Sequence, residues 1–465
     1  MAEHNVTVES TLLALLSDKK YNTLRDILVT MNPSDIAAIF DELEEDRLPL
    51  LFRLLPKELA ADTFVEMEPE AQELLIRGFS DSELKEVIDE MFVDDAVDIV
   101  EEMPANVVRR ILAQADPEMR QSINEILRYP ENSAGTIMTT EYISLRPSMT
   151  VEDAITRIRR TGVDKETIYT CYVTVDRRLV GVTTVKDLLL AKDDGTTIES
   201  IMEPNVISVT THDDQEIVAQ MFSKYNFMAL PVVDNENRLV GIVTFDDAMD
   251  VMEDEATEDI EKMAAITPSD KTYLSMTPVE IWKNRIPWLM LLMVSATFTG
   301  MIISHFESAL SKMVVLTAFI PMLMDTAGNS GSQASVTIIR GLSLNEIEFR
   351  DIFKVIWKEV RVAVLCGLSL AAVCFIKIYL VDNLLLGSFQ EVQVSGVSIY
   401  LVIGVICATL SVTVLFAKVV GCALPLLAKK LGFDPTVMAS PFITTIVDAL
   451  SLLVYFGIAS LCLPL

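Results

Sequence analysis

The sequence predicts a multidomain chain: an α-helical superhelix, an α/β tandem repeat, a long connecting helix and an all-α transmembrane domain of five helices. Its 465 residues, at about 150 per domain, leave room for about three domains. Residues 285–465 are apolar and hold 10 acidic and 11 basic residues, whereas residues 1–284 hold 57 acidic and 26 basic residues. The string at 178–184 recurs at 238–244. An acidic soluble half therefore precedes a membrane half.

Charge and cysteine usage narrow the possible partners. An acidic surface repels phosphate backbones and attracts cations, so nucleic-acid binding is not expected. No C-x-x-C spacing occurs, and five of the six cysteines lie in the apolar half, which favours packing over metal binding or disulfides. They are Cys171, Cys366, Cys374, Cys407, Cys422 and Cys462. No signal peptide precedes the acidic half, which we expect to stay in the cytoplasm.

Residues 1–132 carry helical periodicity in short pieces, without strand-like alternation. Five positions are typical helix starts, because apolar residues follow each at i, i+3 and i+4. They are Pro33, Pro56, Pro69, Asp81 and Pro104. The pieces 37–43, 60–67 and 96–103 are alike, which predicts a small superhelix of helical hairpins.

Residues 133–256 contain the repeat, with units at about 133–198 and 199–256. Each unit is predicted to form strand, helix, strand, strand, helix, and the pair resembles tandem CBS (cystathionine-β-synthase-type) domains. The signature G-x-x-T-x-x-D occurs twice, at 181–187 and 241–247. The resemblance implies that ATP or a related adenine nucleotide binds, with contacts from Tyr169, Thr184, Asp187, Thr244 and Asp247. The alternative is that each Thr and Asp only caps a helix, without a ligand.

A dense run of acidic residues fills 246–259, where spacings of three and four place like charges on neighbouring helix faces. Such charges destabilise a helix unless cations neutralise them. The run is therefore either a solvated face or a cation sensor, and its position directly before the membrane favours the sensor. Residues 257–284 are predicted to connect it to the first span as one long helix, with a break near Pro268.

Five apolar stretches reach the length of about 20 residues that a membrane helix needs. The predicted helices cover about 286–306, 312–339, 359–381, 396–427 and 436–463. Lys and Arg gather in the connections 340–361 and 428–434, which marks these as cytoplasmic. An odd number of spans places the N terminus in the cytoplasm and the C terminus outside the plasma (inner) membrane. Lys418, inside the fourth span, is expected to reach toward the cytoplasm or to face protein.

Asp448 is the only charge in the last 31 residues. A carboxylate there is costly and typically lines a water-filled path, although a protonated Asp bonded to a neighbouring helix is the alternative. Thr444 and Thr445 share its side of the helix, and Pro441 is expected to break the helix. The second span holds the polar stretch 321–333, which is tolerable at membrane depth only beside a cavity or inside protein.

The order of these parts resembles the MgtE family of magnesium transporters and channels. Stretches 321–333 and 441–448 resemble the two membrane motifs of that family, and the match covers essentially the whole chain. The resemblance implies a homodimer in the lipid bilayer with one central pore, where Asp448 of each subunit contributes to a Mg²⁺ site. Other pore and motif residues would be Asp325, whose role stays open, with Gly328, Asn329, Gly331, Gln333, Pro441, Thr444 and Thr445.

The resemblance also implies regulatory Mg²⁺ ions that bridge the acidic cytoplasmic parts. Asp434 matches an acid at the cytoplasmic end of the membrane domain that helps gating. The expected regulatory set is Asp94, Asp95, Asp98, Asp213, Asp214, Glu216, Asp246, Asp247, Asp250, Glu253, Glu255, Glu258, Asp259 and Asp434.

These observations predict a Mg²⁺-selective channel rather than an enzyme. Mg²⁺ keeps its waters and is held through one or two carboxylates. No P-loop occurs, so the inward-negative potential, at ~2.3 kcal/mol per charge per 100 mV, is the expected driving force. Internal Mg²⁺ would neutralise the acidic faces and close the channel. The alternatives are a CBS-regulated transporter of Co²⁺ or Mn²⁺ and a Mg²⁺ sensor without transport. The motifs H-E-x-x-H and G-x-S-x-G, which would indicate an intramembrane enzyme, do not occur.

Overall fold

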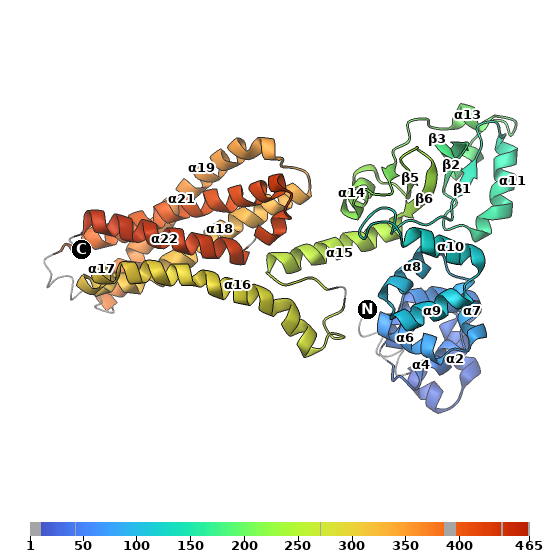
Figure 1. Ribbon diagram of the computed structural model, residues 1–465, viewed down its shortest axis with the longest axis horizontal. Helices are drawn as coiled ribbons and strands as arrows, with labels where there is room; N and C mark the ends of the chain where they lie inside the picture. Colours follow the sequence, from blue (N-terminus) through green and yellow to red (C-terminus); the bar gives the residue numbers. More distant parts are fainter. Residues whose placement is uncertain (1–10, 42, 270, 386–396, 439, 464–465) are drawn as a thin grey trace. The chain divides into compact units, whose positions relative to one another are not determined.

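The computed structural model describes residues 11–41, 43–269, 271–385, 397–438 and 440–463 (Figure 1). The chain divides into two compact units, Met1–Met252 and Glu253–Leu465. The first contains an all-helical part followed by two small sheets with their helices. The second contains the membrane helices.

The first part of unit 1 is a stack of short helices. These are α2 (Tyr21–Leu28), α3 (Pro33–Asp41), α4 (Leu48–Phe52), α5 (Lys57–Val65), α6 (Pro69–Gly78), α7 (Asp81–Ile88), α8 (Val93–Glu102), α9 (Ala105–Gln114) and α10 (Pro117–Ile126). All five predicted starts are confirmed to within one residue. Proline suits the first turn because its missing N–H has no helical partner there. At α7, Ser80 and Glu83 form a capping box.

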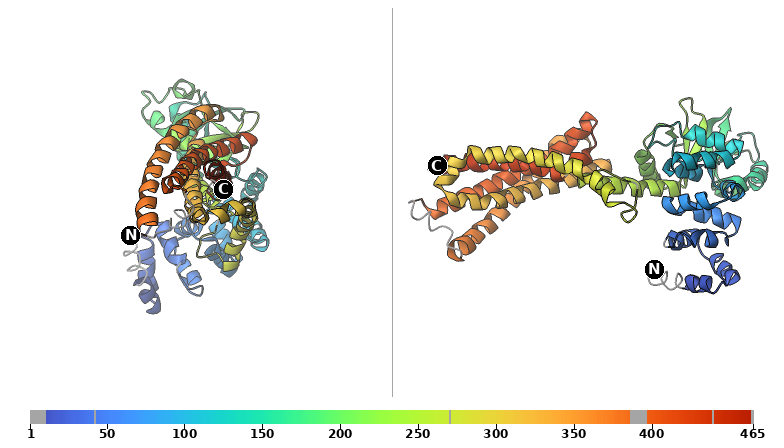
Figure 2. Two further views of the ribbon diagram at one scale, coloured as in Figure 1. Left: turned by 90° about the vertical axis from the view of Figure 1, so that its left-hand side faces the viewer. Right: turned by 60° about the horizontal axis from the view of Figure 1, so that its bottom comes forward.

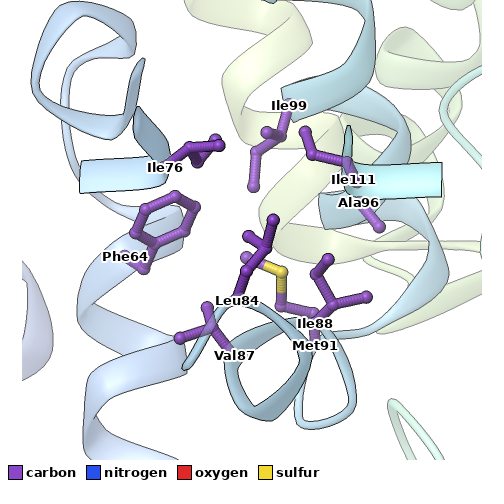
Figure 3. Close-up of a pocket in the computed structure, with 9 residues that line it drawn as sticks. All are labelled: Phe64, Ile76, Leu84, Val87, Ile88, Met91, Ala96, Ile99 and Ile111. Carbon is purple, nitrogen blue, oxygen red and sulfur yellow. The ribbon is translucent and has the colours of Figure 1, made fainter. Parts of the chain in front are cut away.

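The helices of this stack bury their apolar faces against one another. Figure 3 shows a pocket in this core, with a cavity volume of only about 10 Å³. The lining is apolar: Phe64, Ile76, Leu84, Val87, Ile88, Met91, Ala96, Ile99 and Ile111. A void this small and apolar holds no ligand.

The rest of unit 1 has the predicted repeated topology. The elements are β1 (Ile143–Leu145), α11 (Val151–Thr161), η1 (Gly162–Asp164), β2 (Thr170–Val175), β3 (Arg178–Thr184), α12 (Val185–Leu189), α13 (Ile198–Ile201), β4 (Val209–Thr210), α14 (Gln215–Tyr225), β5 (Ala229–Val233) and β6 (Leu239–Thr244). In each sheet a parallel pair precedes an antiparallel hairpin, β1-β2-β3 and β4-β5-β6. The two hairpin tips meet, because the Leu179 N–H donates to the Asn237 carbonyl and the Leu239 N–H to the Arg177 carbonyl.

The acidic helix and the connecting helix differ from the prediction. The structure has one helix, α15, from Phe245 to Met263, so it starts directly after β6 and includes the whole acidic run. It ends well before residue 284. Ala265 has a φ of 55°, and Pro268 follows. The next helix begins only at Pro278, after the N-cap Thr277, whose side chain accepts from the Glu280 N–H. The break near Pro268 is confirmed, but it is a non-helical segment rather than a kink.

Unit 2 is a bundle in which α18, α21 and α22 lie side by side (Figure 2). Its elements are α16 (Pro278–His305), α17 (Glu307–Lys312), η2 (Val314–Phe319), α18 (Ile320–Ser343), η3 (Phe349–Asp351), α19 (Ile352–Lys377), the π-helix η4 (Ile378–Leu385), α21 (Ile399–Leu431), η5 (Pro435–Met438) and α22 (Ser440–Cys462). The predicted second span, 312–339, is wrong at its start, because α18 begins at Ile320 with Pro321 in its first turn. Pro441 likewise opens α22 rather than breaking a helix.

Four stretches of the described chain are long and apolar enough to cross a membrane: Pro278–His305, Phe349–Leu385, Ile399–Leu431 and Pro435–Cys462. The remaining helix of the five predicted spans is the second, α18, which is long enough to cross a membrane but not apolar enough. Its small residues are buried against α21 and α22, whereas Asp325, Asn329 and Gln333 lie on its uncovered face. By contrast, α16 has no buried residue among those described, as suits a helix that faces lipid.

Candidate functional site

Glycines bring α18, α21 and α22 into close contact around Asp448. A Cβ atom at Gly328 would lie 2.6 Å from Thr444 Cγ2 and 3.8 Å from Asp448 Oδ1. A Cβ atom at Gly331 would lie 3.0 Å from Ile443 Cγ2, and one at Gly421 would collide with the Gly331 backbone. Only glycine permits this approach. Thr444 and Asp448 therefore face α18.

Asp448 lies half-buried in α22. Its Oδ1 has no hydrogen-bond partner among the described residues, and its carboxylate interacts electrostatically with that of Asp325 on α18. The hydroxyl of Thr445 does not serve Asp448, because it donates to the Pro441 carbonyl at 3.0 Å. An apolar helix with a carboxylate that lacks a donor suits a cation as the missing partner.

The face of α18 that protein leaves uncovered is polar. Asp325, Asn329 and Gln333 recur every four residues and are exposed, so they form one stripe along the helix. The opposite face is buried and small: Ala327, Gly328, Ser330, Gly331, Ala334 and Ser335. Amide and carboxylate groups are costly against hydrocarbon. The stripe must therefore border water or a second protein surface.

A second set of carboxylates gathers in unit 1, where α8 meets the CBS pair. We call it the α8 cluster: Asp94, Asp95, Glu141, Glu166, Asp246 and Asp247. Asp94 is only 6% exposed, and its Oδ1 has no hydrogen-bond partner among the described residues. The Val93 N–H, at the start of α8, donates to Glu141 Oε2 at 3.2 Å. Asp98 lies one turn further along α8 at the exposed rim of the cluster, where partial burial and the charges of Asp247 and Asp95 raise its pKa to about 8.

Burial and crowding of like charge raise the pKa values of this cluster. Burial, together with the charge of Asp247, raises the pKa of Asp95 to about 7. Burial and the charges of Asp95 and Asp246 raise the pKa of Glu166 to about 8. The pKa of Asp247 rises to about 6, mainly through burial, although hydrogen bonds from Thr244 oppose the rise. The ionised cluster is therefore destabilising unless a cation neutralises it.

The sequence prediction found four members of the α8 cluster and missed Glu141 and Glu166. These two precede strands of the first CBS motif in a region without an acidic run, so only the fold reveals them. No three Asp, Glu, His or Cys side chains of the described residues are close enough to ligate a bare metal ion. Mg²⁺, which usually keeps several waters, could still bind through those waters.

A third set of charges lies in unit 2, where α15 ends beside the loop after α21. Gly432, with a φ of 81°, ends α21 and leads to Asp434. Lys262 Nζ lies 2.7 Å from Asp434 Oδ2 and 2.6 Å from Glu258 Oε1. Burial alone would raise the pKa of Asp434, but the hydrogen bonds from Lys262 and Thr436 hold it below its ordinary value. Burial and the Asp434 charge raise the pKa of Asp259 to about 6.

The predicted regulatory residues thus divide into groups. Glu258, Asp259 and Asp434 come together, with Lys262 as a partner that the prediction missed. Asp250 and Glu255 have further interactions within the structure, and Glu253 is exposed. Asp213 and Asp214 serve local structure: Asp213 Oδ2 accepts from the Thr210 N–H, and Asp214 caps α14 through the Glu216 N–H.

The nucleotide signatures differ between the two CBS motifs. Thr184, which is half-buried, and Asp187, which is exposed, form a capping box at α12. The Val185 N–H donates to the carbonyl of Tyr169, which is 65% exposed. An exposed aromatic ring beside an Asp suits adenosine. At the second motif, Thr244 donates to Asp247, which belongs to the α8 cluster. This arrangement favours the first motif for a nucleotide.

Lys418 is expected either to reach toward the cytoplasm or to face protein, and the structure shows that it faces protein. Its side chain is 6% exposed, and its Nζ lies 3.7 Å from Glu359 Oε2 on α19. Glu359 is 14% exposed. The pair joins α19 to α21.

Comparisons with known proteins identify the family of the chain. Three family descriptions match the chain: a divalent cation transporter domain, MgtE, over residues 320–458; the MgtE intracellular N domain over 31–132; and CBS domains over 134–194 and 198–254. The magnesium transporter MgtE of Thermus thermophilus is 37% identical over 453 residues, which cover 96% of this chain and 97% of the relative. That of Bacillus subtilis is 33% identical and covers 98% of both chains.

Two solved structures resemble the cytosolic part. The cytosolic domain of the Mg²⁺ channel MgtE in complex with ATP is 38% identical, with a TM-score of 0.50 over 52% of this chain and 99% of that one. The soluble part of a magnesium transporter is 33% identical, with a TM-score of 0.51 over 55% of this chain and 100% of that one.

Proposed function

Because the chain belongs to the MgtE family of magnesium transporters, we propose that it is a homodimeric Mg²⁺ channel that intracellular Mg²⁺ closes. The observation that carries the proposal is the polar stripe of Asp325, Asn329 and Gln333, exposed on an intramembrane helix beside Asp448. A second copy that faces this stripe would enclose a polar path. The N terminus is then cytoplasmic and the C terminus extracytoplasmic.

Asp448 is the proposed ion site of the pore. One carboxylate from each subunit attracts a hydrated Mg²⁺ without stripping its waters, and the amides of Asn329 and Gln333 offer further groups to its water shell. Thr444 and Gly328 support the site by holding α22 close to α18. The membrane potential, at ~2.3 kcal/mol per charge per 100 mV, drives entry.

The α8 cluster is the proposed sensor. Mg²⁺ in the cytoplasm binds its ionised carboxylates and stabilises the contact between α8 and the CBS pair. The residues fit the ion, because a buried Asp94 oxygen lacks a donor and the neighbouring carboxylates repel one another. Binding shifts the population toward the closed state. The Asp434 group at the end of α15 then relays closure to the membrane helices.

ATP or a related adenine nucleotide is the proposed ligand of the first CBS motif, at Tyr169, Thr184 and Asp187. The neighbour solved with ATP supports the ligand class, and the exposed Tyr169 ring supports the position.

The test is a current recording from the reconstituted full chain with Mg²⁺ varied on the cytoplasmic side. We expect an inward Mg²⁺ current that falls as internal Mg²⁺ rises, and an Asp95→Asn, Asp247→Asn double variant that needs more internal Mg²⁺ to close. Glu73→Gln, a change on α6 outside the cluster, is the matched control. A chain that carries no Mg²⁺ current, or that carries Co²⁺ or Mn²⁺ in preference, contradicts the proposal.

A further inference from the structure

A basic groove opens on the first CBS motif. Its volume is about 530 Å³, and three arginines line it from three different elements. Arg146 directly follows β1, Arg157 lies on α11, and Arg177 lies in the turn between β2 and β3. Hydroxyl groups complete the lining, from Ser144, Ser148 and Thr174.

The charge of the groove contrasts with its surroundings. Residues 1–284 hold 57 acidic and 26 basic residues, yet the groove has three guanidinium groups and one carboxylate, that of Asp176. Within the described chain, none of the three arginines forms a salt bridge. Unpaired, convergent guanidinium groups are ready to bind an anion.

The backbone of the turn at Asp176 and Arg177 is unusual for these residue types. Their φ angles are 50° and 65°, in the left-handed region that glycine and asparagine prefer. The corresponding turn of the second motif has asparagine, Asn237, at a φ of 60°. Arginine there costs roughly 1 kcal/mol or more. Strain of this kind gathers where the side chain has a function.

The groove is separate from the nucleotide signature of the same motif. In the β2–β3 hairpin, Thr170 pairs with Thr184 and Val175 pairs with Arg178. Thr184 therefore lies at the opposite end of the hairpin from Arg177. Tyr169 and Asp187 lie at the Thr184 end. A ligand at the signature does not account for the three arginines.

We infer that this groove is a second anion site, which binds a small soluble solute bearing a phosphate or diphosphate group. The volume falls within the range of roughly 300–1,000 Å³ of small-molecule sites. Arginine recognises phosphate oxygens through paired N–H donors. Ser148 and the hydrogen-bonded pair of Ser144 and Thr174, 3.0 Å apart, add hydroxyl groups to the lining. Of the three arginines, Arg157 is half-buried, whereas Arg146 and Arg177 are exposed.

The test is a calorimetric titration of the full chain in detergent with inorganic pyrophosphate, in magnesium-free buffer. We expect saturable binding that weakens about tenfold or more in Arg157→Met and in Arg146→Met. Arg159→Met is the matched control, because Arg159 lies on the same helix and is exposed away from the groove lining. It should change the affinity less than twofold, as should Asp187→Ala at the nucleotide signature. Thermal unfolding of each variant establishes that it is folded.

Three outcomes overturn the inference: no binding to the native chain, equal loss in Arg157→Met and Arg159→Met, or loss in Asp187→Ala alone. A lipid headgroup offers the same phosphate chemistry, so the second arm measures sedimentation with phosphatidylglycerol vesicles. The protein in this arm is residues 1–252, which form one compact unit, like the separately solved cytosolic domain of the relative. Vesicle binding that depends on Arg157, without pyrophosphate binding, also overturns the soluble ligand.

Discussion

The two units of the chain differ in how their buried carboxylates are neutralised. In unit 1 the α8 cluster crowds acidic side chains together, and their pKa values rise. In unit 2 most buried or half-buried acids have a basic partner: Glu359 has Lys418, Asp382 has Lys377 and Asp434 has Lys262. Among the buried or half-buried acids of the described membrane helices, Asp448 alone forms no salt bridge. The comparison indicates where a mobile cation is needed, at the α8 cluster and at Asp448.

The largest effect should come from removing the unpartnered acid of the membrane unit. Asp448→Asn keeps the shape of the side chain and removes its charge, so each subunit of the proposed dimer would lose one charge-assisted contact to the hydrated ion. At about 1.5–3 kcal/mol per contact, two contacts correspond to a loss of roughly 100-fold or more in Mg²⁺ flux. The measurement is Mg²⁺ entry into proteoliposomes with an indicator dye.

Asp325→Asn is the control for Asp448→Asn, because it removes an acid from the exposed stripe and leaves Asp448 in place. We expect a smaller loss of flux there. Flux through Asp448→Asn at the native level would show that the pore does not use this carboxylate.

The elements that local chemistry determines could be predicted from sequence. Proline and capping residues fix the starts of α3, α6 and α7, and the repeated hairpin strings fix the CBS topology. The place of Asp448 on the helix also followed from spacing. The second span was placed too early, because hydropathy cannot show that Pro321 starts a new helix after a 3₁₀ segment.

The partners of the charged groups could not be predicted. Lys262 and Asp434 are 172 residues apart, and Lys418 and Glu359 are 59 apart. Such pairs depend on how the helices pack, which no local pattern encodes. Glu141 and Glu166 were missed for the same reason, since the sequence around them has no acidic run and the contact with α8 alone makes them part of the cluster.

A paired acid of the membrane unit should matter for stability rather than for flux. Lys418→Met leaves Glu359 buried without its cation, and breaking a buried pair in this way costs about 3 kcal/mol. We expect the detergent-solubilised protein to unfold at a lower temperature by several degrees, as measured by thermal scanning.

Replacing both partners is the control for Lys418. Lys418→Met with Glu359→Leu removes the uncompensated charge, so the double variant should recover most of the lost stability. Equal instability of the single and double variants would mean that Lys418 acts through packing alone.

The α8 cluster should make the cytosolic unit sensitive to pH. Its carboxylates have pKa values near 6 to 8 when folded and near 4 when unfolded, so the folded state binds more protons between these values. Stability is then highest at low pH within this window and falls as pH rises through the folded pKa values. In magnesium-free buffer we expect a loss on the order of 5 kcal/mol between pH 5.5 and 8, because each pKa unit crossed corresponds to ~1.4 kcal/mol.

The readout for this pH effect is chemical denaturation of residues 1–252, repeated with saturating Mg²⁺. Asp95→Asn with Glu166→Gln should flatten the pH dependence, and Mg²⁺ should do the same in the native sequence. A stability that rises with pH across the window would contradict the assignment of raised pKa values to these acids.

The smallest effect concerns Lys262, whose ammonium group occupies a position between two carboxylates where Mg²⁺ could bind. Its salt bridges to Asp434 and Glu258 are partly exposed and contribute about 0.5–1 kcal/mol. Lys262→Met frees both carboxylates, so we expect closure at two- to fivefold lower internal Mg²⁺ in current recordings. Lys271→Met, which frees only Glu280, is the matched control and should leave the closing concentration unchanged. Closure at higher Mg²⁺ in Lys262→Met would mean that the lysine stabilises the closed state itself, and a paired acid would then gate without a mobile ion.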